Sequence, residues 1–177
     1  MSDPVIDVSK ELFAPASFAQ FEGTFCLPEL SVGPDRYAFA DSVTWTASLN
    51  NTGDALLLRG NVHGVGVTAC ARCLEPVSVT LDGELNEYFL LDAADVPENE
   101  DVDEYRVLPD DHRIELAQFL EAALILEMPN LPLCREDCLG LCPKCGANLN
   151  DGACGCEQAV VLGENNPFAV LKSLDVE

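Results

Sequence analysis

The chain has 177 residues, enough for one domain of ordinary size with a small appendage, and 48% of them are hydrophobic, which is enough for a core. Its 31 Asp and Glu residues outnumber nine Lys and Arg residues, so the formal net charge is −22. Such an acidic surface repels nucleic-acid phosphates and anionic membranes and attracts basic proteins. The longest apolar run is also far shorter than the roughly 20 residues that span a bilayer, so we expect a soluble protein.

The N-terminal half of the chain predicts a β-sheet. Short apolar groups broken by prolines indicate strands and turns up to residue 35. Beyond this point apolar and polar residues alternate in three segments, the pattern of strands with one buried face: residues 37–49 with a bend near Asp41, residues 55–67 and residues 77–91. A turn at residues 50–54 joins the first two, and Cys70–Cys73 lies at the tip between the second and third. These strands should form an antiparallel meander or a partial barrel.

Three glycines interrupt the second of these segments. Gly60, Gly64 and Gly66 lack the side chains that a strand normally packs, so they indicate a bulge or a close approach of another backbone.

Residues 92–111 change character. Nine acidic residues and one arginine occupy these twenty positions, with Pro97 and Pro109 and few large apolar groups. This composition predicts a solvated, mobile connection. An acidic loop without a dedicated role is the simpler interpretation, and a docking segment for a basic partner is the alternative.

Residues 114–128 predict the main helix, which should pack on the sheet. Six residues repeat with the i, i+3, i+4 spacing of one helix face, most of them apolar: Leu116, Phe119, Leu120, Ala123, Leu124 and Glu127. Pro129 ends the helix, because proline cannot donate the next hydrogen bond. The fold class expected from these elements is α+β.

A cysteine box follows the helix and holds six of the nine cysteines. Cys142-Pro-Lys-Cys145-Gly has the form of a metal-binding knuckle, since two thiolates two residues apart can hold one tetrahedral ion. Gly146 lets the backbone turn so that its amides face the sulfurs. Cys154 and Cys156 come after a tight loop containing Asn148, Asn150 and Gly152, and can close a four-thiolate site.

The remaining cysteines suggest a second site. Four of them, far apart in the sequence, would share one ion: Cys70, Cys73, Cys134 and Cys138. Two zinc ions per chain would then be held by eight cysteines, with Cys26 as a spare thiol. A rival arrangement joins the two C-x2-C pairs, as in a zinc ribbon, and groups Cys134 and Cys138 with Cys154 and Cys156. The spacing leaves both arrangements open.

Disulfide bonds are the other use of paired cysteines. No signal peptide opens the chain, so we expect a cytoplasmic protein, where such thiols more often hold metal.

The elements divide the chain into three predicted regions. Residues 1–133 form a β-rich domain with the acidic loop 92–111 and the helix 114–128, and residues 134–157 form the zinc-binding cysteine box. In the tail, residues 158–177, Asn166 caps a short terminal helix with Pro167 at its first position.

The sequence contains none of the common catalytic motifs. It has no H-E-x-x-H, phosphate-loop, G-x-S-x-G or dinucleotide fingerprint. Four-thiolate zinc sites are closed and structural, whereas catalytic zinc keeps an open position. We therefore expect no enzymatic activity. A redox role for Cys70 and Cys73 would fit better between a strand and a helix N-terminus, and Pro76 with the strand after it argues against that setting.

Four motifs together resemble one family. They are Cys70-Ala-Arg-Cys73-Leu-Glu-Pro-Val, the helix from Ile114-Glu-Leu to Leu-Glu-Met-Pro, the box Leu-Cys-x-x-x-Cys-x-Gly-Leu-Cys-Pro-x-Cys-Gly-x-Asn-Leu-Asn, and Asn166-Pro167-Phe168-Ala-Val-Leu. In this order, over roughly residues 35–174, the chain resembles the YceD family of large ribosomal RNA subunit accumulation proteins. Some members look as if they lack the Cys142–Cys156 knuckles but keep the upstream C-x-x-C and a late His/Cys pair. This resemblance favours Cys70, Cys73, Cys134 and Cys138 as one site.

The resemblance implies a non-enzymatic role in accumulation of large-subunit (23S) rRNA and in ribosome biogenesis. The charge of −22 makes direct rRNA binding the less favoured route, because each phosphate contact needs local positive charge. Arg72, Arg135 and Lys144 lie beside the cysteines, where they form a small cationic patch or offset the thiolate charge. We expect a basic ribosomal or assembly protein of the large subunit as the partner. A thiol- or metal-responsive regulator is the alternative function.

Overall fold

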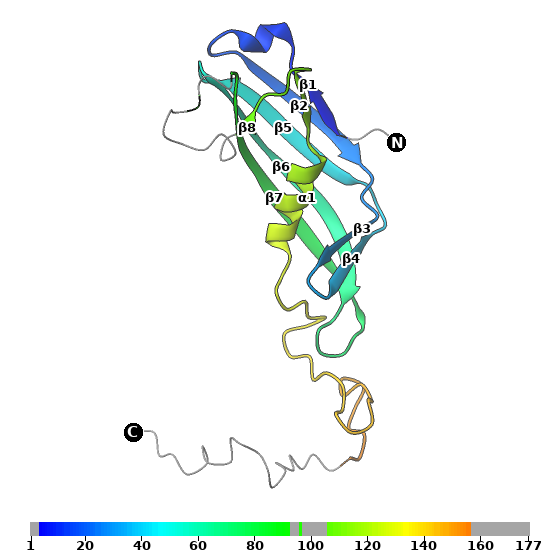
Figure 1. Ribbon diagram of the computed structural model, residues 1–177. Coiled ribbons are helices and arrows are strands. Elements are labelled where there is room, and N and C mark those ends of the chain that lie inside the picture. Colours follow the sequence, from blue (N-terminus) through cyan, green and yellow to red (C-terminus); the bar gives the residue numbers. More distant parts are fainter. Residues whose placement is uncertain (1–3, 93–95, 97–105, 157–177) are drawn as a thin grey trace, which may run out of the picture.

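The structure is a computed structural model that describes residues 4–92, 96 and 106–156. Figure 1 shows a long twisted sheet, one helix lying against it, and the loops that follow this helix beyond one end of the sheet. The elements in chain order are β1 (Val5–Asp7), a 3-10 helix η1 (Lys10–Phe13), β2 (Phe18–Phe25), β3 (Glu29–Val32), β4 (Asp35–Phe39), β5 (Val43–Asn51), β6 (Ala55–Ala69), β7 (Pro76–Leu90), β8 (Arg106–Val107), β9 (Arg113–Glu115) and α1 (Ala117–Glu127).

Strand β6 is the centre of the main sheet. It pairs antiparallel with β7 along their whole length, from Ala55 opposite Leu90 to Ala69 opposite Pro76. On its other edge it pairs first with β5 and then with β4. Strand β2 flanks β5, β3 flanks β4, and β8 adds to β7 in parallel. The predicted meander of three long strands is therefore present as β5, β6 and β7.

The sheet does not close into a barrel within the described residues. Strands β2, β3 and β8 are its outer strands, and β1 pairs separately with β9. The expected partial barrel is thus not confirmed. The predicted bend near Asp41 appears as the break between β4 and β5, which still follow the same edge of β6.

Alternation along the strands separates a buried face from an exposed one. In β5, Trp45, Ala47 and Leu49 are buried while Thr44 and Thr46 are exposed. Helix α1 covers the buried face with Phe119, Leu120, Ala123 and Leu124, four of the residues predicted for its inner side. One core therefore lies between α1 and the sheet. Among the described residues, no helix is long and apolar enough to cross a membrane.

Two glycines allow close backbone approaches. A Cβ atom on Gly83 of β7 would lie 2.7 Å from the carbonyl carbon and oxygen of Ala123, so the missing side chain lets α1 lie directly on the sheet. A Cβ atom on Gly60 of β6 would lie 2.0 Å from the carbonyl oxygen of Thr46. The sequence-based expectation of close approach holds at Gly60. The alternative of a bulge is wrong, because pairing of β6 with β5 and β7 is continuous there.

The start of the predicted helix belongs to another element. Arg113–Glu115 form β9 and pair with β1, and α1 begins at Ala117 instead of residue 114. Ile114 is buried in that small sheet. A short apolar run does not distinguish a strand from the first turn of a helix, which explains the error.

The acidic segment is partly structured. Within residues 92–111, Arg106–Val107 form β8, and Leu108 is buried, so this end is not the solvated connection that composition predicts. Residues 93–95 and 97–105 of this segment, and the predicted terminal helix at residues 166–174, lie outside the described residues.

Candidate metal centre

The first group of cysteines comes from two places in the chain. Cys70 and Cys73 lie on the loop that joins β6 to β7, and Cys134 and Cys138 lie on the segment after α1. The two segments are fastened by backbone hydrogen bonds. The amide of Ala71 donates to the carbonyl of Pro132 (2.8 Å), and the amide of Leu141 donates to that of Arg72 (3.1 Å). The β6–β7 loop and the segment after α1 therefore each place two thiols at the same point.

The spacing of these four sulfurs fits a tetrahedral ion. All lie within 4.8 Å of one another, with Cys70 and Cys138 Sγ 3.8 Å apart and Cys73 and Cys134 Sγ 3.6 Å apart. Four sulfurs around zinc at about 2.3 Å are separated by about 3.8 Å, whereas a disulfide bond is only about 2.05 Å long. The nine cysteines are free thiols, so the disulfide alternative finds no support.

The second group is local in sequence. The sulfurs of Cys142, Cys145, Cys154 and Cys156 also lie within 4.8 Å of one another. The knuckle closes through a hydrogen bond from the amide of Gly146 to the carbonyl of Cys142 (2.8 Å), with Gly146 at a φ of 73°. This left-handed conformation suits glycine, as the sequence suggests.

The structure thus assembles the first of the two arrangements derived from the sequence. Cys70 and Cys73 share a group with Cys134 and Cys138, and the two C-x2-C pairs do not meet as in a zinc ribbon. Cys26 is exposed and belongs to neither group. Two clusters of four cysteines can therefore each bind a metal ion.

Backbone amides and neighbouring thiols shift the acidity of the cluster sulfurs in both directions. Amides of Cys73, Cys134 and Arg72 lower the pKa of Cys70 to about 6, and amides of Cys145 and Lys144 lower that of Cys142 to about 6. Loss of hydration and the neighbouring thiols raise the pKa of Cys134 to about 12. Crowded thiols cannot all ionise without a cation, so metal binding would release the remaining protons.

The pKa of a further cluster sulfur, Cys138, is lowered chiefly by a hydrogen bond from a side chain. Asn150 Nδ2 lies 3.3 Å from Cys138 Sγ. Asn150 belongs to the loop between Cys145 and Cys154, so the second group supplies a contact to the first. The sequence pattern indicates Asn150 only as a loop residue. Its position between Cys145 and Cys154 places it close to the second group, but no local pattern identifies Cys138 of the first group as its partner.

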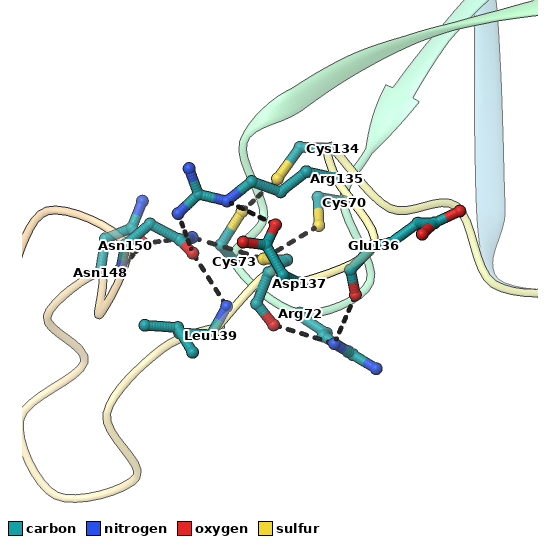
Figure 2. A network of polar contacts seen from close by, with 11 residues as sticks. Cys70, Arg72, Cys73, Cys134, Arg135, Glu136, Asp137, Leu139, Asn148 and Asn150 are labelled. Carbon is teal, nitrogen blue, oxygen red and sulfur yellow. Dashed lines mark hydrogen bonds and ion pairs between the residues drawn. The ribbon is translucent and has the colours of Figure 1, made fainter.

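The two arginines beside the cysteines hold the loops together. Arg72 Nη1 donates to the carbonyls of Cys138 (2.9 Å) and Glu136 (3.4 Å). Arg135 donates to Asn150 Oδ1 (2.7 Å) and pairs with Asp137 at 3.4 Å. Figure 2 shows these contacts around the first group, with Arg135, Asn148 and Asn150 gathered beside it. Both cations are engaged within the chain, which favours local charge compensation over a cationic patch for RNA.

Residues 58–175 match the model of a family described as "Large ribosomal RNA subunit accumulation protein YceD". The matched segment contains all eight clustered cysteines and covers more than half of the chain. The chain belongs to the YceD family. Membership agrees with the resemblance carried by the sequence motifs.

Several mycobacterial proteins, each described as uncharacterized, are similar to the chain. Proteins of Mycobacterium tuberculosis and Mycobacterium bovis are 38% identical over 102 residues, which is 57% of this chain and 48% of theirs. A Mycobacterium leprae protein is 33% identical over 115 residues, covering 60% of this chain and 52% of its own length. The chain thus spans about half the length of the curated relatives it matches. No solved structure matches the chain.

Proposed function

We propose that the protein is a non-enzymatic cytoplasmic factor that supports accumulation of large-subunit (23S) rRNA and thereby ribosome biogenesis. The observation that supports this proposal is the YceD family match over residues 58–175, because the family description names accumulation of the large ribosomal RNA subunit. The closed four-thiolate groups are consistent with a structural rather than a catalytic use of metal.

Zinc is the ion proposed for both groups. Soft thiolates arranged tetrahedrally suit zinc, and iron in an iron–sulfur site is the main competitor for such a set. Cys70, Cys73, Cys134 and Cys138 would hold one ion, and Cys142, Cys145, Cys154 and Cys156 the other. When bound, zinc would supply cross-links between loops that have no large apolar core of their own.

The proposed partner is a basic ribosomal or assembly protein of the large subunit. The net charge of −22 supports a basic partner over direct contact with rRNA. In addition, four of the nine Lys and Arg side chains already lie within ion-pair distance of a carboxylate: Arg36, Arg106, Arg113 and Arg135. Few cations therefore remain for phosphate contacts, whereas exposed carboxylates are abundant.

Affinity purification of the tagged chain tests this partner, with and without ribonuclease and at low and high salt. We expect a basic large-subunit protein to remain bound after ribonuclease treatment. High salt should release it, because exposed charges are screened within about 8 Å at physiological ionic strength. If ribonuclease abolishes the association and the purified chain binds rRNA tightly by itself, direct RNA recognition replaces the protein-partner proposal.

A thiol- or metal-responsive regulator is the second candidate. The observation favouring it is that each group has one exposed cysteine, Cys134 in the first and Cys145 in the second, so that a dissolved oxidant can reach both groups. Accessible thiolates are the form that oxidants attack. Under this alternative, a mild thiol oxidant would release metal and change partner binding reversibly. If partner binding is unaffected by an oxidant that releases the metal, the regulatory alternative fails.

A further inference from the structure

Asn150 uses every hydrogen-bonding position of its side chain to connect the two cysteine groups. Its Oδ1 accepts from the amide of Leu139 (2.8 Å) and from Arg135 Nη2 (2.7 Å). Its Nδ2 donates to Asn148 Oδ1 (2.8 Å) and to Cys138 Sγ (3.3 Å). Figure 2 shows the contacts of Asn150 with Arg135 and Leu139.

These partners fix the orientation of the amide. A backbone N–H and a guanidinium can only donate, so they must face the oxygen of Asn150 and leave its NH2 group toward the sulfur. The Asn150 backbone amide also donates to Asn148 Oδ1 (3.0 Å). The direction of the N–H···S contact is therefore determined by the surrounding network.

The loop that presents Asn150 is anchored at both ends by the second group. Cys145 precedes it and Cys154 follows it, and an ion shared by the two would hold both ends. Inside the loop, the amide of Leu149 donates to the carbonyl of Gly140 (2.9 Å), which keeps it against the segment after Cys138. Without an ion in the second group, this loop loses the cross-link at its ends.

We propose that Asn150 is a positioning residue that couples metal binding at the two cysteine groups. An ion at the second group holds Asn150 against Cys138, and the N–H···S bond then stabilises the thiolate that binds the first ion. This inference rests on the proposed occupancy of both groups by zinc. By linkage, an ion in the first group strengthens binding at the second by the same factor.

The size of the effect follows from the behaviour of groups that contact metal ligands. Loss of such a partner typically lowers metal affinity 10–100-fold. We therefore expect the Asn150→Leu variant, which keeps the number of side-chain heavy atoms but removes all four hydrogen bonds, to lower the affinity of the first group about tenfold.

A double-mutant cycle tests the coupling on the full chain. The four proteins are the native chain, Asn150→Leu, a variant with an emptied second group (Cys145→Ser with Cys154→Ser), and the combination of all three changes. First-group affinity is measured by zinc competition with a chelator and by the absorption of bound cobalt(II). We expect emptying the second group to lower first-group affinity about tenfold in the native background, and to have no further effect when Asn150 is leucine. Equal losses in both backgrounds, or no loss in either, overturn the coupling through Asn150.

A second variant separates donation to the sulfur from simple anchoring of the loop. Asn150→Asp keeps the oxygen that Leu139 and Arg135 contact but replaces the donor facing Cys138. We expect it to lose first-group affinity like Asn150→Leu, whereas native affinity in Asn150→Asp contradicts a role for the N–H···S bond. Asn86→Leu, on the exposed face of β7, is the matched control and should bind both ions normally. Circular dichroism verifies that each variant keeps the sheet.

The zinc content of the native chain is measured first, because it tests the proposed occupancy of the two groups separately from the coupling between them. A content below two ions overturns both the proposed occupancy and the coupling. Two ions with independent affinities overturn the coupling alone.

Discussion

Two residues with different side chains build the same turn at the two knuckles. Leu74 follows Cys73 at a φ of 62° and donates from its amide to the carbonyl of Cys70 (2.9 Å), as Gly146 does after Cys145. A left-handed conformation costs a non-glycine residue about 1–2 kcal/mol. Leu74 is also 65% exposed, so its side chain recovers little by burial. Cross-linking of the cysteines by a metal ion would offset this strain.

The clustering predicts separate losses for the two groups. Cys70→Ser should release one zinc ion, leaving the other, and lower the free energy of unfolding by about 4 kcal/mol or more, because the first group ties the β6–β7 loop to the segment after α1. Cys145→Ser should release the other ion and leave the sheet largely intact. Elemental analysis and thermal unfolding measure both effects.

Cys26→Ser is the control for these variants, since Cys26 is exposed and lies in neither group. It should keep both ions and the native stability. If Cys70→Ser and Cys145→Ser release the same ion, the grouping of the sulfurs is wrong.

At the scale of elements, helix α1 packs directly against strand β7 at one glycine. Gly83 faces the backbone of Ala123, and an added Cβ would meet the helix carbonyl at 2.7 Å. Backbone cannot move aside as the end of a flexible side chain can. Cys134 and Cys138 follow the helix in the chain, so the packing of α1 on the sheet also positions the first cysteine group.

Gly83→Ala should therefore lower the free energy of unfolding by about 1–3 kcal/mol, the usual cost of overpacking. Chemical denaturation measures the change. Glu84→Ala, at the next position on the exposed face, is the control and should stay within about 0.5 kcal/mol of the native chain. An unchanged midpoint for Gly83→Ala would show that α1 does not lie on β7 as described.

Periodicity was sufficient to predict the long elements but not the short ones. Strands β5, β6 and β7 alternate over 9 to 15 residues, and the inner side of α1 repeats clearly, so both were predictable. Strand β9 has three residues and pairs with β1, more than a hundred positions away. No local pattern encodes such a partner.

The ligand residues of the candidate site were predictable from the sequence, but their grouping was not. Thiol pairs at metal-binding spacing identified all eight cysteines, yet both arrangements of the pairs satisfied that spacing. Which pairs meet depends on where the β6–β7 loop lies relative to the end of α1, which is a property of the tertiary fold. The contact of Asn150 with Cys138 depends on the same packing and was therefore not visible in the sequence.

For the whole molecule, the excess of carboxylates is the property that bears on the proposed basic partner. The charge of −22 attracts basic partners over a range set by ionic strength. Zinc at the two groups would hold the loops in one arrangement for such a partner. The description of the family to which the chain belongs names accumulation of the large ribosomal RNA subunit.

The proposed role in large-subunit rRNA accumulation is tested by the ratio of mature large-subunit to small-subunit rRNA in cells depleted of the protein. We expect depletion to lower this ratio, the native chain to restore it, and an equally expressed Cys70→Ser chain to leave it low. An unchanged ratio after complete depletion would contradict a role in large-subunit rRNA accumulation.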